Sequence, residues 1–133
     1  MGSQRLTWAG GLRFEGEDSR GFRFPVSGEE GPAGAKPSDL LPISLAACTA
    51  YDVVNVLRKQ RQELGGLEVR IDARQEERPP WRFLKISMRF VVTGAVDPRK
   101  AERALALGLK DCSVHASIER CVPIEATIEV EAG

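Results

Sequence analysis

The sequence has little histidine, few cysteines and no excess charge of either sign. Its 133 residues include one His and three Cys, and 19 basic side chains balance 19 acidic ones. The lack of a basic excess argues against a protein that binds nucleic acid or another polyanion. The N-terminal residues MGSQRLTWAGG contain no apolar targeting segment, and an odd cysteine count argues against a secreted disulfide scaffold. We therefore expect a cytoplasmic protein whose cysteines are free.

No internal repeat, low-complexity tract or long linker divides the chain. Its length is that of one domain, and its 42% apolar and 29% charged residues are ordinary for a globular protein with a real core. We therefore expect a single domain over residues 1–133.

Short strand-like runs make up the N-terminal third. Residues 5–9, 12–15 and 21–26 are separated by Gly10-Gly11 and by a charged stretch at 16–20. This spacing predicts a hairpin followed by a third strand.

A long helix is predicted within residues 38–66. Ser38 would be its N-cap, Asp39 would lie near the positive end of its dipole, and Gly65-Gly66 would end it. Residues 40–57 are apolar on nearly all sides, which is typical of a central, buried helix. A membrane span is the competing interpretation, but Asp52 at the helix centre disfavours it by about 3 kcal/mol.

Alternating residues predict three further strands. They cover residues 67–74, 83–93 and 122–130, and the inward side chains of the middle strand would be Leu84, Ile86, Met88, Phe90 and Val92. Asp97-Pro98 is typical of a helix start, and that helix would bury Ala101, Ala104, Leu105, Gly108 and Cys112. The order β-β-β-α-β-β-α-β predicts an α+β fold with antiparallel sheets, a long central helix and a second helix.

The three cysteines lie in different settings. Cys48 falls in the middle of the predicted buried helix, where a free thiol is either an inert core residue or a reactive one. Cys112 follows the second helix at a junction where helix amides can face a thiol and favour the thiolate. Cys121 precedes the last strand and is interpreted as a packing residue or a spare thiol.

A zinc site is a second interpretation of the same residues. Cys48, Cys112, His115 and Cys121 add up to a Cys₃His set. The sequence has no Cys-x₂-Cys pair and no second His, so the ligand spacing is weak. We therefore expect neither a metal nor another cofactor.

Three segments together resemble the OsmC/Ohr family of peroxide-detoxifying proteins. They read KPSDLLPISLAACTAYDVVNVLRKQR, LEVRIDARQEERPPWRFLKISMRFVVTG and VDPRKAERALALGLKDCSVHASI. The most specific part is the pairing of an A-A-C-x-A-x-D-V helix with a C-S-V-x-A-S segment some sixty residues later.

The resemblance implies an OsmC-like fold in an intertwined homodimer, with active sites at the dimer interface. Cys48 would be the peroxidatic cysteine and Cys112 the resolving cysteine. Family members with strong activity also use an Arg from the N-terminal strands and a carboxylate at the start of the central helix. The nearest residues here are Arg13, with Arg20 as a second candidate, and Asp39.

The leading hypothesis is a thiol peroxidase that reduces organic hydroperoxides. A dithiol such as a lipoylated protein would be its reductant, and Leu45, Tyr51 and Val54 would form an apolar wall for the substrate. Neither nucleic acid nor a membrane is expected as a partner. The alternative is an OsmC-like binding or redox-sensing protein without an activated cysteine.

Overall fold

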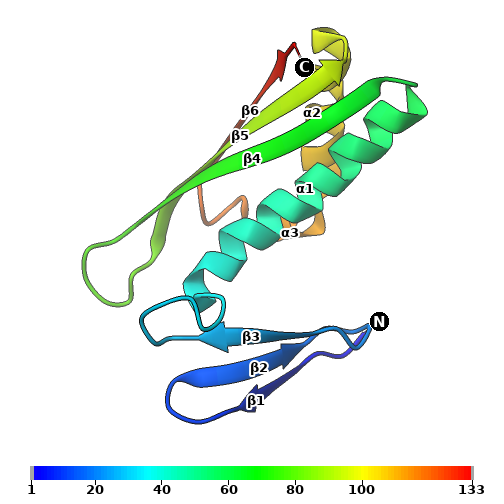
Figure 1. Ribbon diagram of the computed structural model, residues 1–133. Helices are drawn as coiled ribbons and strands as arrows, with labels where there is room; N and C mark the ends of the chain where they lie inside the picture. Colours follow the sequence, from blue (N-terminus) through cyan, green and yellow to red (C-terminus); the bar gives the residue numbers. More distant parts are fainter. Residues whose placement is uncertain (1, 133) are drawn as a thin grey trace. The chain divides into compact units, whose positions relative to one another are not determined.

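Three antiparallel strands come first in the computed structural model, which describes residues 2–132 (Figure 1). They are β1 (Arg5–Trp8), β2 (Arg13–Glu17) and β3 (Arg23–Ser27), in the order β1-β2-β3. Gly10 and Gly11 both have positive φ and form the first turn, as the sequence predicts. A short 3₁₀ helix, η1 (Pro37–Asp39), follows, and this first unit ends at residue 41.

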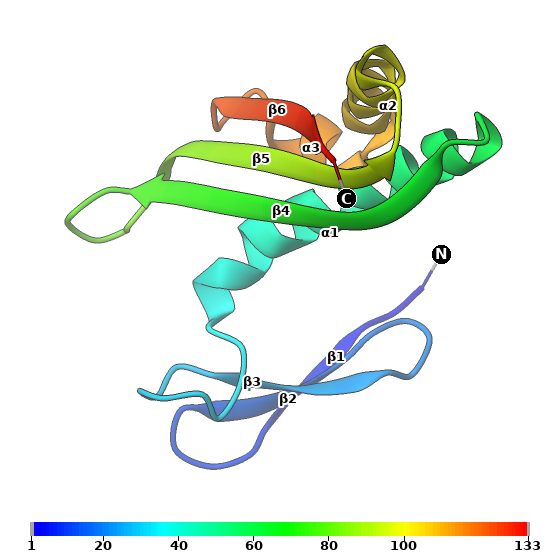
Figure 2. The same cartoon turned by 45° about the horizontal axis from the view of Figure 1, so that its top comes forward.

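The second unit, from residue 42 onward, holds most of helix α1 (Leu40–Lys59) and everything after it. Its strands are β4 (Glu63–Gln75), β5 (Phe83–Ala95) and β6 (Ile124–Glu131), and its other helices are α2 (Pro98–Asp111) and α3 (Ser113–Ile118). The three helices cover one face of the sheet β4-β5-β6 (Figure 2). The core lies between these layers and includes Leu45, Val53, Leu57, Ile86, Phe90, Val92, Ala104 and Cys112.

The register of the sheet keeps apolar side chains on the helix side. Val69, Phe90 and Ile128 lie side by side across the three strands, whereas Arg89 and Glu129 pair on the opposite face. The alternation of residues 83–93 thus predicts the buried face of β5 correctly for four of its five inward residues. Leu84 is the exception at 37% exposure, because it lies next to the turn of the β4–β5 hairpin, before Ile86, where pairing with β6 begins.

The expectation of purely antiparallel sheets is wrong for one pair of strands. β5 and β6 run parallel, with Ile86 opposite Ile124 and Thr93 opposite Glu131. The connection between them contains α2 and α3, and a crossover of that length is what a parallel pair requires.

The predicted end of the central helix is also wrong. α1 ends at Lys59, and Gly65 and Gly66 lie in β4, where the register shifts. Arg61 takes the left-handed conformation (φ 57°), its N–H donates to the Arg58 carbonyl, and the next N–H donates to the Leu57 carbonyl. This is a Schellman motif in which an arginine occupies the position that glycine usually takes.

The two predicted helix starts differ in outcome. Ser38 is not an N-cap, because it lies inside η1, whose own cap position is Lys36. Asp97 is the N-cap of α2, where its carboxylate accepts from the Arg99 N–H at 2.8 Å and Pro98 is the first helical residue. After α2 the chain forms a further helix, α3.

The helical residues 37–59 are long and apolar enough to cross a membrane, with a mean hydropathy of 1.6. A buried core helix satisfies the same criterion. Leu45, Val53 and Leu57 on α1 are fully buried in the second unit, so this helix supplies part of the protein's core.

Candidate active site

Cys48 lies near the middle of α1, and its side chain is half-buried. The next residue, Thr49, is fully buried, and its hydroxyl donates to the Leu45 carbonyl at 3.0 Å. This bond within the helix satisfies a polar group that would otherwise be costly in the core. The Cys48 thiol therefore lies at the boundary between the core and the surface.

Cys112 joins α2 to α3 and is fully buried. Its extended backbone (φ −77°, ψ 117°) ends α2, and its Sγ accepts from the His115 N–H at 3.3 Å. The thiol is thus the N-cap of α3. The prediction that Cys112 lies at a helix junction facing backbone amides is confirmed.

The two cysteines are neighbours although 64 positions separate them in the sequence. Burial raises the pKa of Cys48, but hydrogen bonds from the Cys112 thiol, the Val114 N–H and the Ser113 hydroxyl and N–H outweigh it. The pKa of Cys48 therefore falls below its ordinary value. The Ser113 Oγ lies 3.9 Å from the Cys48 Sγ.

The pKa of Cys112 shifts in the opposite direction. Burial raises it most, and the hydrogen bond to Cys48 and the charge on that sulfur raise it further. The His115 N–H and the Thr49 hydroxyl act against this rise without cancelling it. The pair therefore consists of a half-buried Cys48 whose pKa is lowered and a fully buried Cys112 whose pKa is raised.

Gly108 in α2 allows the helices that carry the cysteines to pack closely. A Cβ at this position would lie 2.9 Å from the Thr49 carbonyl oxygen and 3.3 Å from the Val53 Cγ2. Thr49 adjoins Cys48, and Gly108 lies one helical turn before Cys112. The missing side chain thus contributes to the contact between the two sulfurs.

The candidate arginine Arg13 lies in β2 of the first unit, where its Nε is 3.4 Å from the Glu29 Oε1. The sequence did not point to Glu29. Gly11 leaves room for this carboxylate, because a Cβ there would lie 2.7 Å from its Oε2. Arg20 follows β2 in an exposed turn, and Asp39 is exposed in η1. The roles of Arg13, Arg20 and Asp39 toward Cys48 stay predictions.

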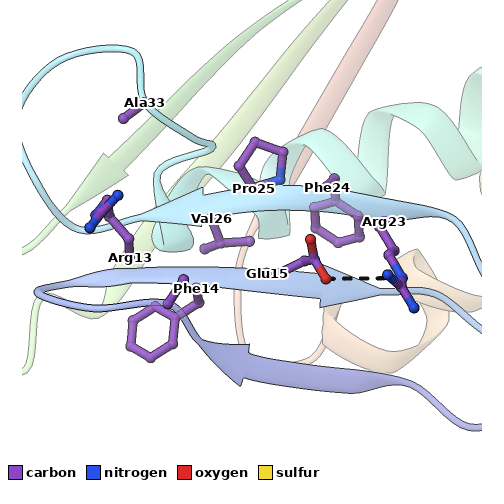
Figure 3. Close-up of a pocket in the computed structure, with 9 residues that line it drawn as sticks. Arg13, Phe14, Glu15, Arg23, Phe24, Pro25, Val26 and Ala33 are labelled. Atoms are coloured by element: carbon purple, nitrogen blue, oxygen red, sulfur yellow. Dashed lines mark ion pairs between the residues drawn. The ribbon is translucent and has the colours of Figure 1, made fainter.

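Arg13 also lines a pocket of about 240 Å³ over β2 and β3. Figure 3 shows Arg13 and Arg23 at opposite ends of this pocket, with Phe24 and Val26 between them. The Nε of Arg23 lies 3.9 Å from the Glu15 Oε1. Both guanidinium groups thus already have carboxylate partners within the first unit.

The three predicted wall residues lie at different depths. Leu45 is fully buried in the core, Val54 is half-buried, and Tyr51 is 69% exposed. Tyr51 is therefore free to contact a ligand in this chain, whereas Leu45 reaches no solvent. Their role in substrate binding stays a prediction.

The proposed zinc ligands do not assemble. Cys121 is exposed beyond α3, and the Nδ1 of His115 lies 3.4 Å from the Glu119 Oε2. Among residues 2–132, no three His, Cys, Asp or Glu side chains are placed to hold a metal ion. Cys48 and Cys112 form a pair without a further ligand of these types in the described chain.

Sequence reasoning missed Thr49, whose hydroxyl lowers the pKa of Cys112, and Ser113, whose Oγ lies 3.9 Å from the Cys48 Sγ. Each directly follows one of the two cysteines. For Ser113 that adjacency was a usable signal. A serine at the start of a helix lies close to any group toward which the first backbone amides of the helix point.

Comparison with known proteins identifies the family. The family model described as OsmC-like protein matches residues 28–127. Protein YhfA of Escherichia coli K12 is 34% identical over 131 residues, which cover 96% of this chain and 97% of that protein.

Two solved structures are similar in fold. A hypothetical protein from Aquifex aeolicus has a TM-score of 0.90 at 25% identity, covering all of this chain and 98% of its own. An organic hydroperoxide resistance protein OsmC from Legionella pneumophila has a TM-score of 0.66 at 18% identity, covering 98% and 97% of the two chains. The α+β fold of this chain is the OsmC-like fold, and the chain belongs to the OsmC-like family.

Proposed function

We propose that this protein is a dimeric cytoplasmic thiol peroxidase that reduces organic hydroperoxides through Cys48 and Cys112. The observation that carries the proposal is the contact between the two thiols together with the opposite shifts of their pKa values. A peroxidatic cysteine must be a thiolate within reach of solvent, and its resolving partner must wait nearby as a thiol.

The first step is the attack of the Cys48 thiolate on the terminal oxygen of the hydroperoxide. An S–O bond forms, the O–O bond breaks, and the alkoxide leaves and takes up a proton to become the alcohol. Cys48 becomes a sulfenic acid, oxidised by two electrons. The Cys112 thiol, which donates to this sulfur in the reduced state, keeps the nucleophile charged until the peroxide arrives.

In the second step Cys112 attacks the sulfur of the sulfenic acid. An S–S bond forms, the S–O bond breaks, and hydroxide leaves as water with the proton from Cys112. The negative charge on Cys48, which raises the pKa of Cys112, disappears when the sulfenic acid forms. Oxidation of Cys48 therefore makes Cys112 more acidic at the moment it must react. A dithiol reductant, such as a lipoylated protein, then restores both thiols by disulfide exchange.

An exposed apolar stripe on α1 supports the homodimer. Ile43, Ala47 and Tyr51 recur every four residues on one side of the helix, with Ile43 51% and Tyr51 69% exposed. A second copy that covers this stripe would bury it next to Cys48. Tyr51 and Val54 would then give the site an apolar wall suited to fatty or aryl hydroperoxides, with the fully buried Leu45 behind them.

Activation by a guanidinium is part of the same proposal. Arg13 from the N-terminal strands, or Arg20 in its place, would stabilise the Cys48 thiolate, with Asp39 as the supporting carboxylate. The carboxylate that Arg13 contacts within its own unit is Glu29, so Glu29 is a second candidate for that support.

The test is oxidation of the reduced protein by cumene hydroperoxide, followed by intact mass and peptide mapping. We expect a loss of two hydrogens and a peptide in which Cys48 and Cys112 are linked, with Cys121 still a thiol. The Cys121→Ser variant should react like the wild type, and Cys48→Ser should not react. No mass change within minutes at stoichiometric peroxide would refute the proposal and favour a binding or sensing protein.

A further inference from the structure

Ser113 is the first residue of α3, and its side chain is exposed beside the half-buried Cys48. Its Oγ lies 3.9 Å from the Cys48 Sγ, a separation within hydrogen-bonding range for sulfur. Its carbonyl accepts from the Ser117 hydroxyl at 2.8 Å, which ties the residue into α3. The hydroxyl thus lies next to the sulfur on which the proposed chemistry takes place.

The N-cap of α3 is not what holds the Ser113 hydroxyl in this place. A serine at a helix start commonly caps the helix with its own oxygen. Here the Cys112 Sγ is the acceptor for the His115 N–H. The Ser113 hydroxyl is therefore left to interact with Cys48 and with solvent.

We propose that Ser113 is a further catalytic residue of the cysteine site, whose hydroxyl donates a hydrogen bond to the Cys48 thiolate. The catalytic role of Ser113 rests on the proposed function, but the existence of the hydrogen bond does not depend on that function. The Cys112 thiol donates to the same sulfur from the core side. The Cys48 thiolate would then have one side-chain donor that is consumed when the disulfide forms and one, Ser113, that remains.

This position gives Ser113 a specific role in the first step. Its hydroxyl would stabilise the Cys48 thiolate that attacks the peroxide. The fully buried Cys112 would instead take part in the second step, when it forms the disulfide.

Several titratable groups lie on the elements around Cys48. They are Cys112 at the end of α2, His115 in α3, Glu119 directly after α3, and Asp52 one turn further along α1. All are unchanged in a Ser113 variant. A difference between such a variant and the wild type therefore reports the hydroxyl rather than these groups.

The test measures the rate at which iodoacetamide alkylates Cys48 in the full-length reduced protein, as a function of pH. In Ser113→Ala we expect the midpoint of this profile to rise by about half to one pH unit, since one long hydrogen bond, with the sulfur and oxygen 3.9 Å apart, is lost. At pH values well below the midpoint this reduces the thiolate fraction, and hence the rate, by about three- to tenfold. Ser113→Thr keeps a hydroxyl and should restore the profile.

Ser117→Ala is the matched control, because it removes a hydroxyl from the same helix that bonds to the Ser113 carbonyl rather than to Cys48. Its alkylation profile should match the wild type. A Ser113→Ala profile that coincides with the wild type would overturn the role of Ser113. A wild-type protein that leaves cumene hydroperoxide unreacted would instead refute the proposed function, and the alkylation experiment would still decide whether the hydrogen bond exists.

Discussion

Replacing Gly108 by alanine tests whether the contact between α1 and α2 holds the two cysteines together. The added Cβ would lie 2.9 Å from the Thr49 carbonyl oxygen, closer than real Cβ atoms approach another heavy atom. That oxygen belongs to the backbone of α1, so a rotamer change offers no relief. Either the helices move apart or the contact stays strained.

Two effects of opposite sign set the magnitude. In a helix interior alanine is favoured over glycine by about 1 kcal/mol. Overpacking a buried contact costs roughly 1–3 kcal/mol, and a clash with backbone places this site near the upper end. We therefore expect Gly108→Ala to lower the free energy of unfolding by about 2 kcal/mol. With an m-value of about 2 kcal/mol/M, the urea midpoint falls by about 1 M.

The assay is urea unfolding at one fixed protein concentration, because the stability of the proposed dimer would depend on concentration. Ala106→Gly, at an exposed position of the same helix, is the matched control and should lose about 1 kcal/mol from helix propensity alone. Gly108→Ala should also form the Cys48–Cys112 disulfide more slowly under peroxide. An equal or higher urea midpoint for Gly108→Ala would refute the packing argument.

Further predictions concern the thiols, a helix cap and the exposed stripe. Iodoacetamide at neutral pH should label Cys48 well before Cys112, because the pKa of Cys48 is lowered, that of Cys112 is raised, and Cys112 is fully buried. Mass spectrometry of timed samples would contradict this if both cysteines reacted together. Cys112→Ser should keep a cap for α3 but leave a persistent sulfenic acid on Cys48 after peroxide treatment. Dimedone labelling detects the sulfenic acid, and immediate further oxidation of Cys48 would contradict the prediction. Asp97→Ala should lower the unfolding free energy by about 1 kcal/mol in urea, whereas Asp97→Asn should stay near the wild type. Ile43→Asp together with Tyr51→Asp should convert a dimer to a monomer in sedimentation, and an unchanged dimer would place the interface elsewhere.

Local sequence signals predict the elements that local physics controls. Asp97-Pro98 marks the start of α2 because capping involves only neighbouring residues. The alternation in β5 predicts its buried face because successive side chains point to opposite sides of a strand. The N-terminal strands follow from the Gly10-Gly11 turn for the same local reason.

Signals that need a partner far along the chain were misread or absent. Gly65-Gly66 looks like a helix end, but the Schellman motif falls at Arg61 and the glycines join a strand paired with β5. The direction of β6 depends on the crossover through α2 and α3, which periodicity within a strand does not encode. Glu29 was overlooked because it lies in the loop after β3, whereas its partner Arg13 lies in β2.

The sequence by itself determined that two cysteines in an OsmC-like pattern are the centre of interest, since that pattern is a matter of residue type and spacing. The tertiary structure decided how the two differ. Burial raises the pKa of Cys112, whereas the groups around Cys48, the Ser113 hydroxyl among them, lower the pKa of Cys48. Acidity depends on which groups surround a thiol in space, and folding alone brings residue 48 next to residue 112.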